Sequence, residues 1–285
     1  MPYKLPMGAD RPGLFVFVLD QSGSMANKWP QSPKHRKADA LADVLNNTLA
    51  EISARCVKGE GQVSDRCHIA MLGYEGSTVA SVWSGPLAGR EAVPISEVAK
   101  QPMEWKKTKV QVENGAGGLV EVDEDVPVWV KPTTGGGTPM KEALAKALGV
   151  VNQWLPTHAD CFPPVVIHIT DGEPTSGDPS AAGTALRALQ TNDGNVLLVN
   201  IHIPDGAPVT ACFPADRTSL PGNVPSASLL FDMTSEIPAE LVDVAQNAGL
   251  NVVPRSRLMI LNADAIDVIR LIQFATVGTM GANTD

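Results

Sequence analysis

The chain has 285 residues, of which 44% are hydrophobic, and a formal net charge of −9. This length and composition allow one large buried core and are typical of a globular protein. The acidic balance argues against general nucleic-acid binding, which requires a basic surface. Four widely spaced cysteines without a C-x-x-C pair indicate neither a zinc cluster nor a redox motif. Without a membrane span or an apolar signal core in Met1 to Arg11, we expect a cytoplasmic protein.

The first part of the chain predicts a strand, a helix and two more strands. Residues 14–19 form an apolar run rich in β-branched and aromatic residues, which favours a strand buried on both faces of a parallel sheet. Residues 38–52 carry apolar residues at helical spacing and predict a long amphipathic helix. Residues 67–74 and 78–83 predict two strands joined by a tight turn, and therefore an antiparallel pair.

Residues 104–131 predict an irregular β-hairpin, which we interpret as an insertion in the domain. The insertion contains Trp105 and Trp129. Indole side chains are frequent anchors of protein interfaces, so both are candidate partner-binding residues. Packing against their own domain is the ordinary explanation for both tryptophans.

The second half of the chain alternates helices and strands. The predicted helices are residues 139–154, 181–189, 237–248 and 263–274, and the predicted strands are residues 165–169, 195–203 and Leu229–Phe231. The alternation predicts the α/β class, with a doubly wound, mostly parallel central sheet, helices on both faces and one antiparallel edge strand. We expect a single domain over residues 1–285, with a C-terminal extension from about residue 204 that begins as a surface loop.

Small hydroxyl and carboxylate residues follow two of the predicted strands and precede one helix. Asp20, Ser22 and Ser24 follow the first strand, Asp171 follows a later one, and Thr138 begins a helix. Because the carboxyl ends of the strands form the ligand crevice of an open α/β sheet, these side chains should lie together. Oxygen donors suit Mg²⁺ or Mn²⁺, whereas Zn²⁺ would favour His or Cys.

The pattern Asp20-x-Ser22-x-Ser24, together with Thr138 and the turn at Asp171, resembles the metal-ion-dependent adhesion site of von Willebrand factor A domains and integrin I domains. The resemblance implies that both serine hydroxyls bind the metal. It implies that Thr138 and the two aspartates bind the metal directly or through water.

This resemblance extends over residues 14–203. The hairpin insertion at residues 104–131, within that range, and the C-terminal extension from about residue 204 are not part of the minimal domain. Within the family, residues 170–175 and 137–140 are similar to those of small bacterial cytoplasmic A-domain proteins. Those proteins are associated with tellurium resistance and with Ser/Thr kinase and 2C-type phosphatase genes.

Lys34, Arg36 and Lys37 belong to a basic cluster in a segment, residues 21–38, that contains no Asp or Glu. A solvated loop is the ordinary explanation of such a cluster. The dipole of the following helix disfavours cations near its start, so helix stability does not account for these charges. A basic rim that steers an acidic partner toward the metal is the alternative, and it makes these three residues candidates for partner binding.

The sequence therefore predicts a non-enzymatic, divalent-cation-dependent module that captures an Asp, Glu or C-terminal carboxylate of another protein. The family resemblance implies a bacterial cytoplasmic signalling or stress-response assembly, with a Ser/Thr kinase or phosphatase system among the candidate partners. A Mg²⁺-dependent hydrolase or phosphatase is the alternative. It is disfavoured because Ser22 stands where an aspartyl-nucleophile enzyme commonly has a second Asp, and no His or Lys accompanies the motif. A structural subunit with a vestigial site is the third alternative.

Overall fold

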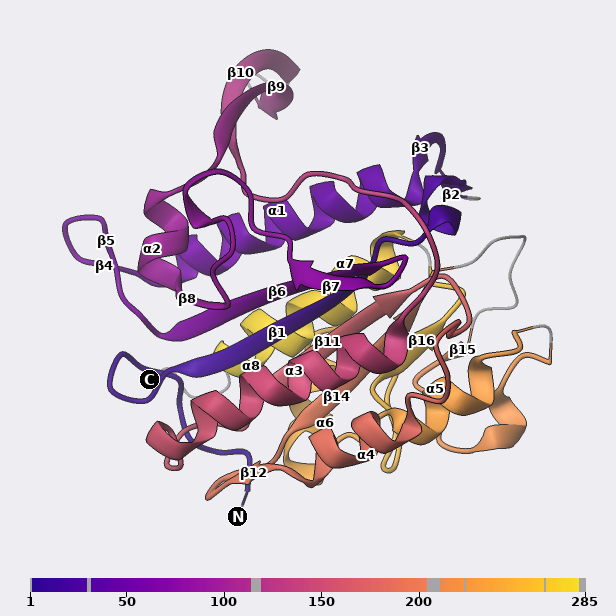
Figure 1. Ribbon diagram of the computed structural model, residues 1–285. Coiled ribbons are helices and arrows are strands. Elements are labelled where there is room, and N and C mark those ends of the chain that lie inside the picture. The colour runs from indigo at the N-terminus through magenta and orange to yellow at the C-terminus, as the bar shows by residue number, and fades with distance from the viewer. Residues whose placement is uncertain are drawn as a thin grey trace.

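The computed structural model describes residues 2–29, 32–113, 119–203, 211–222, 224–263 and 265–281. One central sheet organises the chain, with strand order β15-β16-β14-β11-β1-β6-β7 and with β8 also paired to β6 (Figure 1). Its strands are β1 (Gly13–Asp20), β6 (Cys67–Glu75), β7 (Thr78–Ser81), β8 (Ala92–Pro94), β11 (Val165–Thr170), β14 (Leu197–His202), β15 (Ala211–Cys212) and β16 (Met259–Leu261). The five inner strands are parallel, while β7, β8 and β15 pair antiparallel at the edges.

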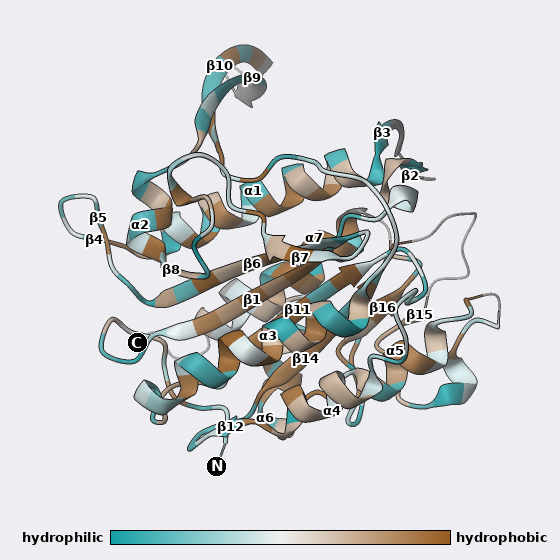
Figure 2. Cartoon of the chain, in the orientation of Figure 1, coloured by the Kyte–Doolittle hydropathy of each residue, from teal (hydrophilic) through white to brown (hydrophobic). Residues whose placement is uncertain are grey.

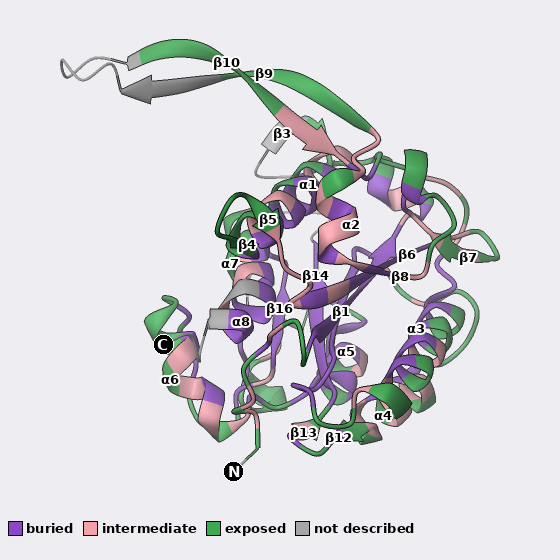
Figure 3. Cartoon of the chain, turned by 90° about the vertical axis from the view of Figure 1, so that its left-hand side faces the viewer, coloured by how far each residue is buried: buried purple, intermediate pink, exposed green. Residues whose placement is uncertain are grey.

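Helices cover both faces of the sheet, as the side view in Figure 3 shows, with α1, α6 and α7 on one face and α3, α4 and α5 on the other. Their bounds are α1 (Lys37–Arg55), α2 (Ile95–Lys100), α3 (Met140–Trp154), α4 (Ser180–Ala188), α5 (Ala227–Met233), α6 (Ala239–Asn247), α7 (Ala265–Gln273) and α8 (Thr279–Gly281). The protein is therefore of the mixed α/β class, with a mostly parallel central sheet.

Strand β1 lies at the centre of this arrangement and is buried along its whole length. Successive side chains of a strand point to opposite faces, and here both faces are apolar. Phe15 and Phe17 join the core under α1 and α7, whereas Val16 and Val18 join the core under α3 and α5. Figure 2 shows the same hydrophobic character along the neighbouring strands. The continuous apolar run in the sequence follows from this two-sided burial.

The strand register brings the polar ends of the inner strands to one edge of the sheet. Leu19 of β1 pairs with Ile169 of β11, and Asp20 pairs with Tyr74 of β6. Parallel strands end at the same edge, so the residues that follow β1 and β11 lie beside each other.

Short elements complete the chain. They are β2 (Lys28–Trp29), β3 (Ser32–Arg36), β4 (Val57–Lys58), β5 (Gln62–Val63), β9 (Glu104–Glu113), β10 (Leu119–Val128), β12 (Gln190–Thr191) and β13 (Gly194–Asn195), with 3-10 turns at Gly23–Ala26, Gly85–Leu87, Leu155–Thr157 and Arg217–Ser219 and a π-helical turn at Phe274–Gly278. Strands β9 and β10 form an antiparallel ribbon that projects from the body of the molecule (Figure 3).

The structure corrects the predicted end of the sheet. Leu229–Phe231 lies in helix α5, where Leu230 and Phe231 pack on the core, so the predicted strand is wrong. The last parallel strand is instead β16, which pairs with β14. Three consecutive apolar residues are compatible with either element, and tertiary packing decides between them. Residues beyond 204 therefore supply two strands of the central sheet, β15 and β16.

Across the described residues, no helix is both long and apolar enough to cross a membrane.

A buried polar chain crosses the sheet on the α3 face. The Asn200 amide nitrogen donates to Thr234 Oγ1, so the amide oxygen faces His168 in β11. His168 Nδ1 therefore carries a proton and donates to Asn200 Oδ1 at 2.7 Å. The neutral His168 ring can therefore accept the Tyr74 hydroxyl at Nε2, which lies 2.8 Å away. Burial lowers the pKa of His168 to about 4.

We predict that this histidine makes folding stability depend on pH. Between pH 6.5 and about 4 the unfolded chain binds a proton at His168 and the folded chain does not, so stability falls as the pH falls through this window. The depressed pKa corresponds to a loss of about 3 kcal/mol. Urea denaturation from pH 7 to pH 4 should show a shallower loss for His168→Gln than for the wild type. His35→Gln, at an exposed position, should keep the wild-type slope, and equal slopes for all three proteins would contradict the assignment.

Candidate metal centre

The five predicted metal ligands come from three loops at one edge of the sheet. Asp20 is the last residue of β1, Ser22 and Ser24 lie in the turn after it, Asp171 follows β11, and Thr138 precedes α3. All except Ser24 are buried, with at most 5% of each residue exposed. The structure thus brings together all five residues in the manner that the strand order requires.

Hydrogen bonds connect the serine loop to the loop after β11. The Ser22 and Ser24 hydroxyl oxygens are 3.0 Å apart. Ser24 Oγ donates to Asp171 Oδ1 at 2.7 Å, across 147 residues of sequence. Two hydroxyls and one carboxylate therefore form a continuous polar group.

The Asp20 carboxylate is held by its own loop and by β11. The backbone N–H of Ser22 donates to Oδ1 at 2.8 Å, and the Thr170 hydroxyl donates to Oδ2 at 2.7 Å. Burial raises the pKa of Asp20, and the hydrogen bonds from Ser22 and Thr170 oppose that rise. The sequence pattern assigns no role to Thr170, although Thr170 directly precedes Asp171 in the turn that carries the family resemblance.

A glycine-rich segment docks Thr138 against this edge. Gly135 donates its N–H to Gln21 O at 2.7 Å, and Gly23 donates to Gly136 O at 3.0 Å. Gly136 has φ +61°, and a Cβ there would collide with the backbone of Gly76. Close approach of two backbones and a left-handed conformation together require glycine at this position.

The Thr138 hydroxyl faces the serine loop. A Cβ atom added to Gly172 would lie 3.6 Å from Thr138 Oγ1 and 4.0 Å from Ser24 Oγ, which places these two hydroxyls around one small space. The Thr138 backbone is fixed by Thr175, whose hydroxyl accepts the Thr138 N–H at 2.8 Å. Among the described residues, the Thr138 hydroxyl has no hydrogen-bond partner of its own.

These donors fit a hard divalent cation. The described part of the chain contains no cluster of three or more His, Cys, Asp or Glu side chains, and the donors gathered at this edge are two carboxylates and three hydroxyls. Each carboxylate oxygen of Asp20 and Asp171 already accepts a hydrogen bond, whereas the hydroxyls retain free lone pairs. These two carboxylates and three hydroxyls would hold a hard cation such as Mg²⁺ or Mn²⁺, which favours oxygen ligands.

The structure corrects one of the three residues of the predicted basic rim. Lys37 is fully buried and donates from Nζ to Asp171 Oδ2 at 2.8 Å, so it cannot line an exposed surface. Arg36 is exposed and forms a two-point contact with Asp39 at 2.7 and 2.8 Å, so its role in partner binding stays a prediction. The side chain of Lys34 lies outside the described residues. The sequence did carry a signal for Lys37, since a cation at a helix start needs a compensating partner.

The two candidate tryptophans have different environments. Trp105 is 59% exposed at the base of the β9–β10 ribbon and remains a candidate anchor. Trp129 is buried, and its indole N–H donates to Val98 O at 2.7 Å. Trp129 is therefore a core residue and is corrected as a partner-binding residue, because apolar burial and a satisfied N–H account for it fully.

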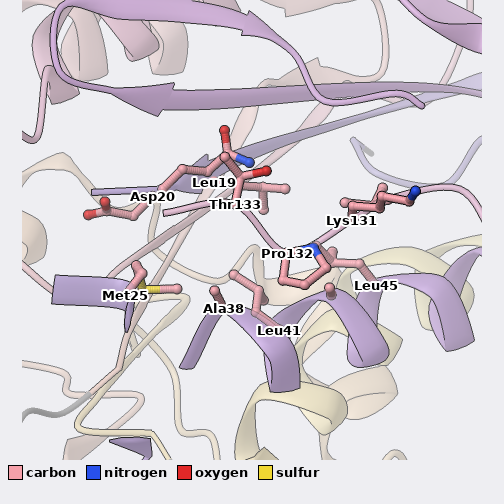
Figure 4. Close-up of a pocket in the computed structure, with 12 residues that line it drawn as sticks. Leu19, Asp20, Met25, Ala38, Leu41, Leu45, Lys131, Pro132 and Thr133 are labelled. Carbon is pink, nitrogen blue, oxygen red and sulfur yellow. The ribbon is translucent and has the colours of Figure 1, made fainter. Parts of the chain in front are cut away.

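A small cavity lies behind the site, between the end of β1 and helix α1. Its volume is about 20 Å³, which is room for about one water molecule, and Asp20, Met25 and Thr133 are among its lining residues. Figure 4 shows that the Asp20 carboxylate points away from Lys131, which also lines this cavity. Lys131 therefore does not neutralise Asp20.

Comparison with known proteins leaves the family open. The chain matches no protein-family profile and no curated protein. Among solved structures it is similar to the pilus adhesin SpaC of Lactobacillus rhamnosus GG, at 14% identity and a TM-score of 0.47 over 95% of this chain and 30% of that one. The Streptococcus pneumoniae pilus adhesin RrgA follows at 16% identity and a TM-score of 0.29, over 57% of this chain and 21% of that one. The human COPII-coat protein Sec24c has 11% identity and a TM-score of 0.37, over 72% of this chain and 27% of that one. This chain thus spans less than a third of each, and we infer no function from such low similarity.

We predict that Asp171→Asn destabilises the metal-free protein by about 3 kcal/mol, because it removes the carboxylate charge that lies 2.8 Å from the buried Lys37 ammonium. Asp178→Asn is the matched control, since Asp178 is exposed and its replacement should cost less than about 0.5 kcal/mol. Urea denaturation in EDTA measures both. Equal losses would show that the ion pair is not the source of the effect.

Proposed function

We propose that this chain is a von Willebrand factor A-like, non-enzymatic module that binds another protein through one divalent cation, in a bacterial cytoplasmic signalling or stress-response assembly. One observation supports this most: Ser22, Ser24 and Asp171, from loops far apart in sequence, are joined by hydrogen bonds at the carboxyl edge of the sheet. Asp20 and Thr138 complete the oxygen-donor set. Mg²⁺ or Mn²⁺ is the cation that such donors favour.

The charge of the site favours an anionic partner. Asp20 and Asp171 supply two negative charges, and Lys37 supplies one positive charge within hydrogen-bonding distance of Asp171. A bound dication would therefore leave a net charge of about +1, rather than the neutral site expected from the two carboxylates alone. We propose that an Asp, Glu or C-terminal carboxylate of the partner completes the coordination of the ion, as an oxygen ligand that replaces water. A Ser/Thr kinase or phosphatase system is the candidate source of that partner.

The β9–β10 ribbon extends the proposed binding surface. A cavity of about 430 Å³ lies between α1 and the base of the ribbon, lined by His35, Asp39, Glu104 and Lys106 among others. Its mixed charges suit a polar partner surface, and exposed Trp105 stands beside it in sequence. We propose that the ribbon contributes to the choice of partner.

Metal-dependent stabilisation tests the site. A ligand that binds only the folded state stabilises it by about 2.7 kcal/mol at a hundredfold excess over Kd, so Mg²⁺ or Mn²⁺ should raise Tm by several degrees. Ser22→Ala combined with Ser24→Ala should remove this increase while preserving the fold, as judged by circular dichroism. Ser180→Ala with Ser176→Ala, on the loop and helix start beyond the site, is the control pair. An unchanged response in the Ser22/Ser24 variant would reject the site.

Replacement of the ribbon tests its role in partner choice. The exchange should be limited to residues 106–126, because Trp129 and Val130 are buried and bonded to Asn46. With a short Gly/Ser linker in its place, the Mg²⁺-dependent rise in Tm should persist while co-purification of partners from the source cell in Mg²⁺ weakens. Trp105→Ala in the intact chain should cost about 2 kcal/mol of partner binding if this indole is an anchor. Partner recovery identical to wild type in both variants would place recognition elsewhere.

A further inference from the structure

Lys37 has an unusual position for a charged residue. It is the first residue of α1, its backbone N–H donates to Asn27 O at 2.9 Å, and its side chain has 0% exposure. Its ammonium lies 2.8 Å from Asp171 Oδ2, and the other oxygen of that carboxylate binds Ser24. The ammonium therefore contacts the same carboxylate that the proposed metal centre uses.

Helix stability does not explain this placement. The start of a helix carries a partial positive charge, which disfavours a lysine. Helix α1 has no side-chain cap, and the acidic residue of its first turn, Asp39, pairs with Arg36. Removing an ammonium from water costs several kcal/mol unless an anion pairs with it. Lys37 is thus placed at a cost to its own helix, and the buried carboxylates are what it compensates.

Neighbouring cations do not serve this purpose. Arg36 is directed to Asp39 on the surface, and Lys131 lies on the side of the cavity away from the Asp20 carboxylate (Figure 4). Asp20 itself is stabilised by neutral donors, the Ser22 N–H and the Thr170 hydroxyl. Within the described ranges, Lys37 is therefore the cation that contacts a carboxylate of this edge.

We propose that Lys37 is a resident cation of the site, which stabilises the metal-free protein and weakens the binding of a divalent ion. The proposal rests on the proposed function, since it concerns the same centre. A fixed positive charge close to a bound dication repels it, by an energy that corresponds to orders of magnitude in affinity at short range inside a protein. The site then fills only at a high metal concentration, and it stays net positive when filled.

Titration with Mn²⁺ alone, followed by electron paramagnetic resonance of the free ion, tests this. Lys37→Met keeps much of the side-chain volume and removes the charge, so it should bind Mn²⁺ at least about tenfold more tightly than wild type. Lys131→Met removes a lysine charge from the adjacent exposed loop and should change the Kd by less than about twofold. Lys37→Gln, which retains a hydrogen-bond donor, should tighten Mn²⁺ binding in the same direction as Lys37→Met.

Thermal unfolding gives a second readout. In EDTA, Lys37→Met should lower Tm by about 5 °C or more, because Asp171 loses its counter-ion, and saturating Mn²⁺ should restore the loss. If a variant does not fold in EDTA, its recovery on addition of Mn²⁺ supports the proposal. Failure of both Lys37 variants to fold even with Mn²⁺ would overturn it, because the ion would then not replace the ammonium.

The outcomes separate this inference from the proposed function. Equal Mn²⁺ affinity in wild type and Lys37→Met, with binding still lost in the Ser22/Ser24 variant, overturns the role of Lys37 and leaves the metal centre in place. Absence of Mn²⁺ binding in every variant overturns both. If Lys37→Met binds Mn²⁺ and the wild type does not, the result supports Lys37 as a substitute for the ion. The same result overturns the metal dependence in the proposed function.

Discussion

Two buried carboxylates at one edge of the sheet are the constraint on which this structure depends. Asp20 and Asp171 are both almost inaccessible to solvent, and their mutual repulsion adds to the cost of burying each charge. The neighbouring residues supply the donors: a backbone N–H, three hydroxyls and one ammonium reach the four carboxylate oxygens. Burying these charged groups costs free energy that a purely structural edge would not require. This cost is the physical reason to propose that the edge is a functional centre.

The fold makes the convergence possible through strand direction and backbone packing. Parallel strands β1 and β11 release their chains at the same edge, so residues 150 positions apart, Asp20 and Thr170, form a direct hydrogen bond. The segment before α3 joins them because Gly136 allows its backbone to lie directly on that of Gly76. A larger residue in place of Gly136 would move Thr138 away from the serine loop, although none of the five candidate residues would have changed.

The local sequence predicts a helix or strand correctly where its pattern of apolar residues extends over many residues. It does not where the pattern covers only a few. The two-sided apolar run of β1 and the helical spacing of α1 allowed both to be placed within a few residues. Leu229–Phe231 and Met259–Leu261 are each three apolar residues, and their local patterns do not distinguish strand from helix. Only pairing with β14 makes the second a strand, and only packing on the core makes the first a helix.

The sequence by itself determined the α/β class and the strand ends that carry Asp20, Ser22, Ser24 and Asp171, because the spacing of apolar residues marks each helix and strand. It also determined that these residues meet, because parallel strands end at the same edge of a sheet. Tertiary structure alone decided the fate of individual charged and aromatic side chains. The charged segment around Lys37 predicts a solvated loop, yet Lys37 is buried against a carboxylate. For Trp129 the sequence leaves an interface anchor and core packing both open, and the structure places it in the core. Burial depends on which distant segment covers a residue, here the strand end at Asp171 and the helix at Val98, and no local pattern records that contact.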